Sequence, residues 1–82
     1  MKTPWRWLYG SHVVEESLGS STMRVLELWI QRDRGGDSEN LARSARGRGV
    51  RVSWVSRRDL DRLSAGESHQ GLAVKVVGQD SG

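Results

Sequence analysis

The stretch Val25-Leu26-Glu27-Leu28-Trp29-Ile30-Gln31 is the most apolar segment of this 82-residue chain, and it predicts the central strand of a sheet. Toward the N-terminus, Trp5–Tyr9 alternates its aromatic residues on one face and stops at Gly10, which is typical of a short strand. Toward the C-terminus, two further strands are predicted at Val50–Trp54 and Leu72–Val77. The chain therefore carries four predicted strands.

Helices are predicted in the three gaps between these strands. Ser11 can cap the first helix, which ends at Gly19. Asp37 and Ser38 offer caps to the second, and Ser56–Asp59 fits the capping box that opens a short third helix. Strand and helix thus alternate along the whole chain.

This alternation predicts an α/β fold. Strands joined through helices favour right-handed crossovers and a mainly parallel sheet with helices on both faces. The link before the last strand is tight, and the alternative is that this strand runs antiparallel. The expected architecture is a small three-layer α/β/α sandwich with a four-stranded, mostly parallel or mixed sheet.

Four tryptophans contribute large apolar surfaces to this small domain. Trp29 lies in the most apolar strand and Trp54 on the inward face of another, so both are predicted in the core. Trp5 and Trp7 alternate on an edge-like strand with Arg6 between them. For this pair we expect packing in the core or an interface, with stacking on nucleic-acid bases as the alternative.

The composition excludes several classes of protein. With 35% hydrophobic and 28% charged residues, the chain is typical of a soluble globular domain, and it has no apolar run long enough for a membrane span. It contains no cysteine, which suits the cytoplasm and leaves two histidines as a poor basis for a zinc site. It has no phosphate loop, dinucleotide fingerprint, nucleophile elbow or His-Glu-x-x-His motif. We therefore predict no catalytic residue, cofactor or metal within this chain.

The distribution of charge favours a nucleic-acid partner. The net charge is +3, and 11 of the 13 cationic residues are arginine. Arg43–Arg62 holds seven arginines against two acids, a local net of +5, while the remainder has six bases and eight acids, a net of −2. The guanidinium fork matches phosphate oxygens, although a solvated basic face is the alternative. The candidate phosphate contacts are Arg43, Arg46, Arg48, Arg57 and Arg58.

Two short polar segments offer further contacts. Gly10–His12 lies where the first strand turns into a helix, and Ser68–Gly71 precedes the last strand. If the last strand runs antiparallel to the first, these segments meet and form one patch able to bind phosphate, ribose or base edges. The alternative is two ordinary turns whose side chains cap nearby backbone. The candidate residues are Gly10, His12, His69, Gln70 and Gly71.

In this order the segments resemble the N-terminal substrate-binding domain of the SpoU (TrmH-type) RNA 2′-O-ribose methyltransferases. Gly10–Leu18 is similar to that domain's Gly-x-His-x-Val-x-Glu-x-Leu turn, and Val25–Ile30 is similar to its next strand. Arg48–Val52 and Arg58–Leu63 resemble its Gly-Val-x-Val and Leu-Asp-x-Leu segments. The most diagnostic match is His69–Val76, a His-Gln-Gly followed by a valine-rich strand.

The resemblance implies a fold similar to the kink-turn-binding ribosomal proteins and a domain, residues 1–77, that holds structured ribosomal or transfer RNA. Residues 78–82 would begin a flexible linker to a catalytic domain, absent here, that binds S-adenosylmethionine and usually forms the homodimer. No membrane partner is implied. Two alternatives stay open: a stand-alone structural RNA-binding protein of the kink-turn type, and a protein-interaction module if the arginines are scattered over the surface.

Overall fold

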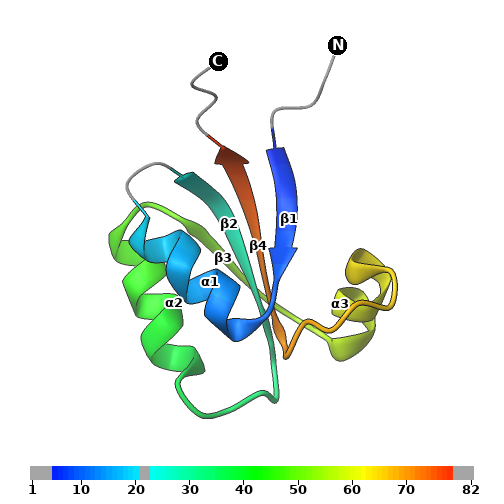
Figure 1. Ribbon diagram of the computed structural model, residues 1–82. Coiled ribbons are helices and arrows are strands. Elements are labelled where there is room, and N and C mark those ends of the chain that lie inside the picture. Colours follow the sequence, from blue (N-terminus) through cyan, green and yellow to red (C-terminus); the bar gives the residue numbers. More distant parts are fainter. Residues whose placement is uncertain (1–4, 21–22, 79–82) are drawn as a thin grey trace.

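All seven predicted elements are present, in the predicted order (Figure 1). The computed structural model describes residues 5–20 and 23–78. None of the helices in these ranges is long and apolar enough to cross a membrane. The strands are β1 (Trp5–Tyr9), β2 (Met23–Gln31), β3 (Arg51–Val55) and β4 (Leu72–Gly78), and the helices are α1 (Ser11–Gly19), α2 (Ser38–Gly47) and α3 (Arg57–Ser64).

The sheet is mixed, with the strand order β1-β4-β2-β3. Among the described strands, only β2 and β3 pair in parallel, because β4 runs antiparallel to both of its neighbours. The expectation of a mainly parallel sheet is therefore wrong, and the mixed alternative is confirmed. The cause is the short helix α3, which has eight residues and does not return the chain to the opposite end of the sheet. Strand β4 therefore begins at the end where β3 stops and runs in the opposite direction (Figure 1).

The main core lies between the sheet and the two helices α1 and α2, which cover one face (Figure 1). Apolar positions of each helix recur at helical spacing, so each buries one stripe against alternate strand residues. Helix α3 lies on the opposite face and buries Leu60 there. The buried cluster of the main core consists of Val14, Leu18, Leu28, Ile30, Ala42, Ala45, Val50, Leu72, Val74 and Val76.

The capping box of α3 is formed as predicted. The Ser56 hydroxyl accepts a hydrogen bond from the Asp59 amide at 3.2 Å, and the Asp59 carboxylate accepts one from the Ser56 amide at 3.3 Å. Both bonds satisfy donors that the first turn of a helix leaves open. The capping box could be predicted from the sequence because its two residues are only three positions apart.

The predicted cap at Ser11 is wrong, whereas Asp37 holds the N-cap position of α2 as predicted. Gly10, not Ser11, is the N-cap of α1, and no local side chain caps that helix. Asp37 is the N-cap of α2 but makes no capping bond, because its carboxylate accepts a hydrogen bond from Arg34 instead. The Ser38 hydroxyl donates to the Gly35 carbonyl. Neither α1 nor α2 is therefore capped by the side chain of its own N-cap residue.

The two tryptophans predicted in the core differ in environment. Trp54 is half-buried and packs against the main core, as expected. Trp29 is also half-buried but lies on the opposite face, where its ring meets that of Trp7 with centroids 5.1 Å apart. Alternation along β2 puts Leu28 and Ile30 on the core side and Trp29 on the side that α3 covers only in part. The prediction for Trp29 is therefore wrong.

The expected linker falls largely outside the described residues. Strand β4 extends to Gly78, one residue further than predicted, because Gly78 is in register with Met23 of β2. Residues 79–82 are not described.

Candidate nucleic-acid interface

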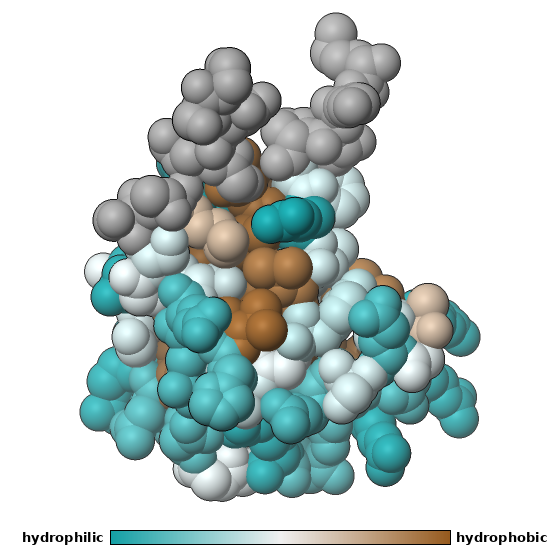
Figure 2. Space-filling model, in the orientation of Figure 1, coloured by the Kyte–Doolittle hydropathy of each residue, from teal (hydrophilic) through white to brown (hydrophobic). Residues whose placement is uncertain are grey.

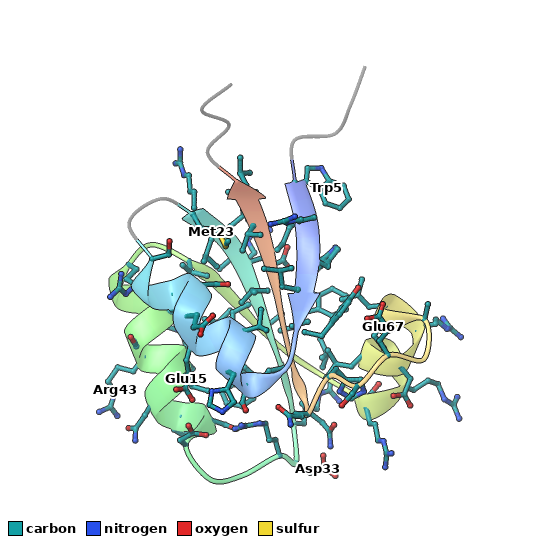
Figure 3. All side chains as sticks on the ribbon, viewed as in Figure 1. Trp5, Glu15, Met23, Asp33, Arg43 and Glu67 are labelled. Atoms are coloured by element: carbon teal, nitrogen blue, oxygen red, sulfur yellow. The ribbon has the colours of Figure 1, made fainter. Side chains whose placement is uncertain are left out.

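One end of the sheet gathers the starts of all three helices. β1, β2 and β3 run in the same direction, and each leads into a helix at that end (Figure 1). Helix starts carry open amides and a positive partial charge, which favour anions such as phosphate. Hydrophilic residues cover this end in Figure 2, and Figure 3 labels Asp33 there. We call it the helix-start end and define it by residues 10–12, 31–37, 56–59 and 68–71.

The two polar segments singled out from the sequence meet at the helix-start end. The Ser11 amide and hydroxyl both donate to Gln70 Oε1, at 2.8 and 3.0 Å. The Gly10 amide donates to the Leu72 carbonyl at 3.2 Å. Gln70 therefore caps α1 across 59 positions of sequence, in the role usually taken by a local serine or aspartate. The predicted juxtaposition is confirmed, and it follows from the antiparallel pairing of β1 and β4.

His69 lies beneath this junction. Its side chain is buried, with 8% of the residue exposed. Nε2 lies 2.7 Å from the Asp61 carboxylate, and Nδ1 accepts a hydrogen bond from the Gly71 amide at 2.9 Å. Because Nδ1 is an acceptor, the proton belongs on Nε2, which donates it to Asp61. Both ring nitrogens are thus engaged within the protein, and His69 fixes the turn that presents Gln70.

Arg34 also organises this end, and no sequence pattern distinguishes it from Arg32 nearby. Its Nε donates to the Gln70 carbonyl at 3.1 Å, and its Nη1 donates to Asp37 at 2.7 Å and to Ser38 Oγ at 3.1 Å. The hydrogen bond from Arg34 lowers the pKa of the Asp37 carboxyl. Arg34 therefore ties the turn at Gln70 to the start of α2.

His12 and the Gln70 amide nitrogen are the polar groups left available at the junction. His12 is exposed in the first turn of α1, and its ring makes no hydrogen bond within residues 5–20 and 23–78. Gln70 is exposed as well, and only its oxygen is used in capping. An imidazole and an amide can both donate to, and accept from, ribose hydroxyls and base edges.

The five candidate arginines do not form one patch. All are exposed, but Arg43, Arg46 and Arg48 lie on α2 or just after it, whereas Arg57 and Arg58 lie in the first turn of α3. These helices cover opposite faces of the sheet (Figure 1), and Figure 3 shows the Arg43 side chain pointing away from the sheet on the α2 side. Only Arg57 and Arg58 belong to the helix-start end.

A shallow groove of about 540 Å³ runs along the helix-start end beside the turn at Gln70. Its walls include Arg34, Arg57 and Asp61. Asp61 already contacts His69 and lies 4.0 Å from Arg57 Nε, so this carboxylate is partly neutralised. Asp33 and Glu67 also line the groove, so two arginines face three acids there, and the groove has mixed charge beside the exposed amide of Gln70.

Comparison with known proteins agrees with the family resemblance seen in the sequence. Residues 7–80 match the family described as RNA 2′-O ribose methyltransferase substrate binding. Over 70 residues the chain is 33% identical to the 23S rRNA (guanosine-2′-O-)-methyltransferase RlmB of Shewanella oneidensis, covering 84% of this chain and 28% of that protein. It is 35% identical over 68 residues to the protein of the same name from Coxiella burnetii, covering 82% and 27%. The chain thus spans little more than a quarter of these relatives.

Proposed function

The chain belongs to the family of RNA 2′-O-ribose methyltransferase substrate-binding domains, and on that premise we propose that it binds ribosomal RNA for methylation by another domain. The observation that carries the proposal is the family match, which extends over residues 7–80. The relatives described above are named as 23S rRNA methyltransferases, which favours this function over a stand-alone structural RNA-binding protein. Because the arginines are divided between two faces of the sheet, the local charge alone does not support RNA binding.

In this proposal the helix-start end is the main RNA contact. Phosphates lie at the starts of the helices, where Arg57 and Arg58 add positive charge. His12 and Gln70 hydrogen-bond ribose hydroxyls or base edges, while His69 and Gly71 position the turn. Gly10 allows α1 to begin close to Gln70, since its φ of +101° suits glycine and a side chain there would face Gln70 Oε1. Arg43, Arg46 and Arg48 form a separate basic surface that reaches more distant phosphates.

Chemistry belongs, in this proposal, to a separate domain. That domain binds S-adenosylmethionine, forms the homodimer and is joined through a linker that includes residues 79–82. The same proposal places the enzyme in the cytoplasm, where ribosomal RNA is available. The present chain contributes RNA affinity and no methyl-transfer residue.

Removing the arginines of α3 is expected to weaken RNA binding and reduce its salt dependence. The Arg57→Ala and Arg58→Ala variants should each lower the slope of log affinity against log salt by about 0.7 to 0.9 if one phosphate contact is lost. The measurement is a filter-binding titration of 23S rRNA fragments at several salt concentrations. Arg6→Ala is the matched control, because Arg6 is exposed on β1 away from the helix-start end. An equal effect of all three variants would contradict a localised contact.

Changing Gln70 to glutamate should separate its structural role from its RNA contact. A carboxylate can accept the same hydrogen bonds from Ser11 and lies favourably at a helix start, so the free energy of unfolding should be retained. Its negative charge should nevertheless repel phosphate and weaken RNA binding. Gln70→Ala should lose both, with a stability loss of about 0.5 to 2 kcal/mol for a missing cap. Urea unfolding and RNA titration of both variants test this, and unchanged RNA affinity in Gln70→Glu would contradict the contact.

A further inference from the structure

Within residues 5–20 and 23–78, a helix covers the face of the sheet opposite α1 and α2 at only one end. There the Tyr9 hydroxyl donates to the Leu63 carbonyl of α3 at 3.0 Å. Toward the other end of β1, Trp7 is half-buried and Trp5 is 41% exposed. Figure 3 shows the Trp5 side chain at the start of β1, away from α3. Large aromatic rings thus remain accessible on a sheet face beyond the reach of the helix.

These rings are held in place by their neighbours. The Lys75 ammonium lies 4.3 Å from the centroid of the Trp5 ring, a cation–π contact. Trp7 meets Trp29 edge to face at 61°, and the Trp29 indole N–H donates to the Glu27 carboxylate at 2.8 Å. The orientation of each ring is therefore set before any partner arrives, which reduces the entropy lost on binding.

Charged residues are interleaved with the rings, and the three basic ones (Lys75, Arg51 and Arg62) outnumber the two acidic ones (Glu27 and Asp59). In the sheet register Lys75 lies between Trp7 and Glu27, and Arg51 lies on the far side of Glu27. Arg62 and Trp29 line an adjoining hollow of about 310 Å³. The centre of a protein–protein interface is typically depleted of charge, whereas basic residues among accessible aromatic rings are typical of surfaces that bind single-stranded nucleic acid.

We propose that this surface, made up of Trp5, Trp7, Trp29, Arg51 and Lys75, binds a single-stranded segment of RNA by base stacking. The inference rests on the proposed function, because it assigns a second contact to the same RNA. Trp5 and Trp7 are two residues apart on one strand, about 6.6 Å along its axis, so two successive unstacked bases can each meet a ring. The cations beside the rings then face the phosphates of that segment.

The placement of the surface suits a strand that continues from the helix-start end. Trp5 begins β1, and the chain reaches Gly10 at the helix-start end only five residues later. The strand between Trp5 and Tyr9 rises about 13 Å, which a few nucleotides of extended RNA span. RNA held at the helix starts can therefore pass its single-stranded flank along β1.

The test uses a fluorescently labelled short oligouridine, which has no stable structure, and two substitutions of the most exposed ring. Trp5→Leu keeps an apolar side chain but removes the ring, and we expect it to weaken oligouridine binding about tenfold. Trp5→Phe keeps a ring and should retain most of the affinity. Trp5 is 41% exposed, so both variants should fold, which the melting temperature checks.

Two results of the binding titrations would overturn the proposal. One is equal oligouridine affinity in the unmodified chain, Trp5→Leu and Trp5→Phe; the other is no binding of oligouridine by the unmodified chain. Sedimentation of the same samples shows whether the surface instead joins two copies, and self-association lost in Trp5→Leu with unchanged RNA affinity would also overturn it. Binding of structured 23S rRNA fragments by Arg57→Ala tests the proposed function separately, because Arg57 lies on α3 at the helix-start end.

Discussion

Replacing His69 with alanine is expected to lower the free energy of unfolding by about 2 kcal/mol or more, since a buried donor left without a partner costs about 1 to 3 kcal/mol. The Gly71 amide would lose its acceptor and the Asp61 carboxylate would lose its donor. The buried ring would also leave a space beneath the turn. RNA affinity should fall as well, because Gln70 is no longer held in place. Urea unfolding and RNA titration of the same variant give both values.

His12→Ala is the matched control, because it removes the same type of ring from an exposed position. Its stability should change by less than about 0.5 kcal/mol, as is usual for surface substitutions. Its RNA affinity should fall, since His12 is the histidine with free ring nitrogens. If His69→Ala lost RNA affinity without losing stability, His69 would contact RNA itself and its role as a positioning residue would be wrong.

The order of the elements was predictable because each depends on local patterns. Apolar residues alternate in the strands and recur at helical spacing in the helices, and the capping box of α3 lies within four residues. The direction of β4 was harder to predict, because it depends on the end of the sheet at which α3 stops. Once β4 is antiparallel to β1, the meeting of Gly10 with the turn at Gln70 follows from topology alone.

The roles of individual polar residues were harder to predict, because they depend on contacts between distant segments. Gln70 caps α1 from 59 positions away, and Arg34 reaches the Gln70 carbonyl from the loop that follows β2. His69 and Gln70 are neighbours, yet one is buried and the other exposed. Residue type and spacing do not reveal which side of a turn faces the protein.

The arginines that give the local charge of +5 are close together in the sequence but do not form one surface in the structure. β3 lies between α2 and α3 in the sequence, and the chain passes through it from one face of the sheet to the other (Figure 1). Arg43 and Arg57 therefore lie on opposite sides although only 14 positions separate them. Charge counted over a window of sequence predicts one surface only when the window stays on one side of the sheet.

Gly71→Ala is expected to lower the free energy of unfolding by about 2 to 4 kcal/mol, the sum of about 1 for a left-handed backbone and 1 to 3 for overpacking. Gly71 has a φ of +78°, and a Cβ there would lie 3.0 Å from Arg34 Cδ and 3.3 Å from Arg34 Cγ. Arg34 would have to move, which weakens its bonds to the Gln70 carbonyl and to Asp37. The turn and the start of α2 should loosen together, and RNA affinity should fall with them.

Gly35→Ala provides the control that separates backbone strain from steric conflict. Gly35 has a similar φ of +71°, but a Cβ there meets nothing within 4 Å. It should therefore cost about 1 kcal/mol, the backbone penalty alone, and leave Arg34 in place. The difference between the two variants measures the packing of Gly71 beneath Arg34, and adding Arg34→Ala to Gly71→Ala should recover part of that difference. Equal losses for Gly35→Ala and Gly71→Ala would show that the contact with Arg34 does not hold this end together.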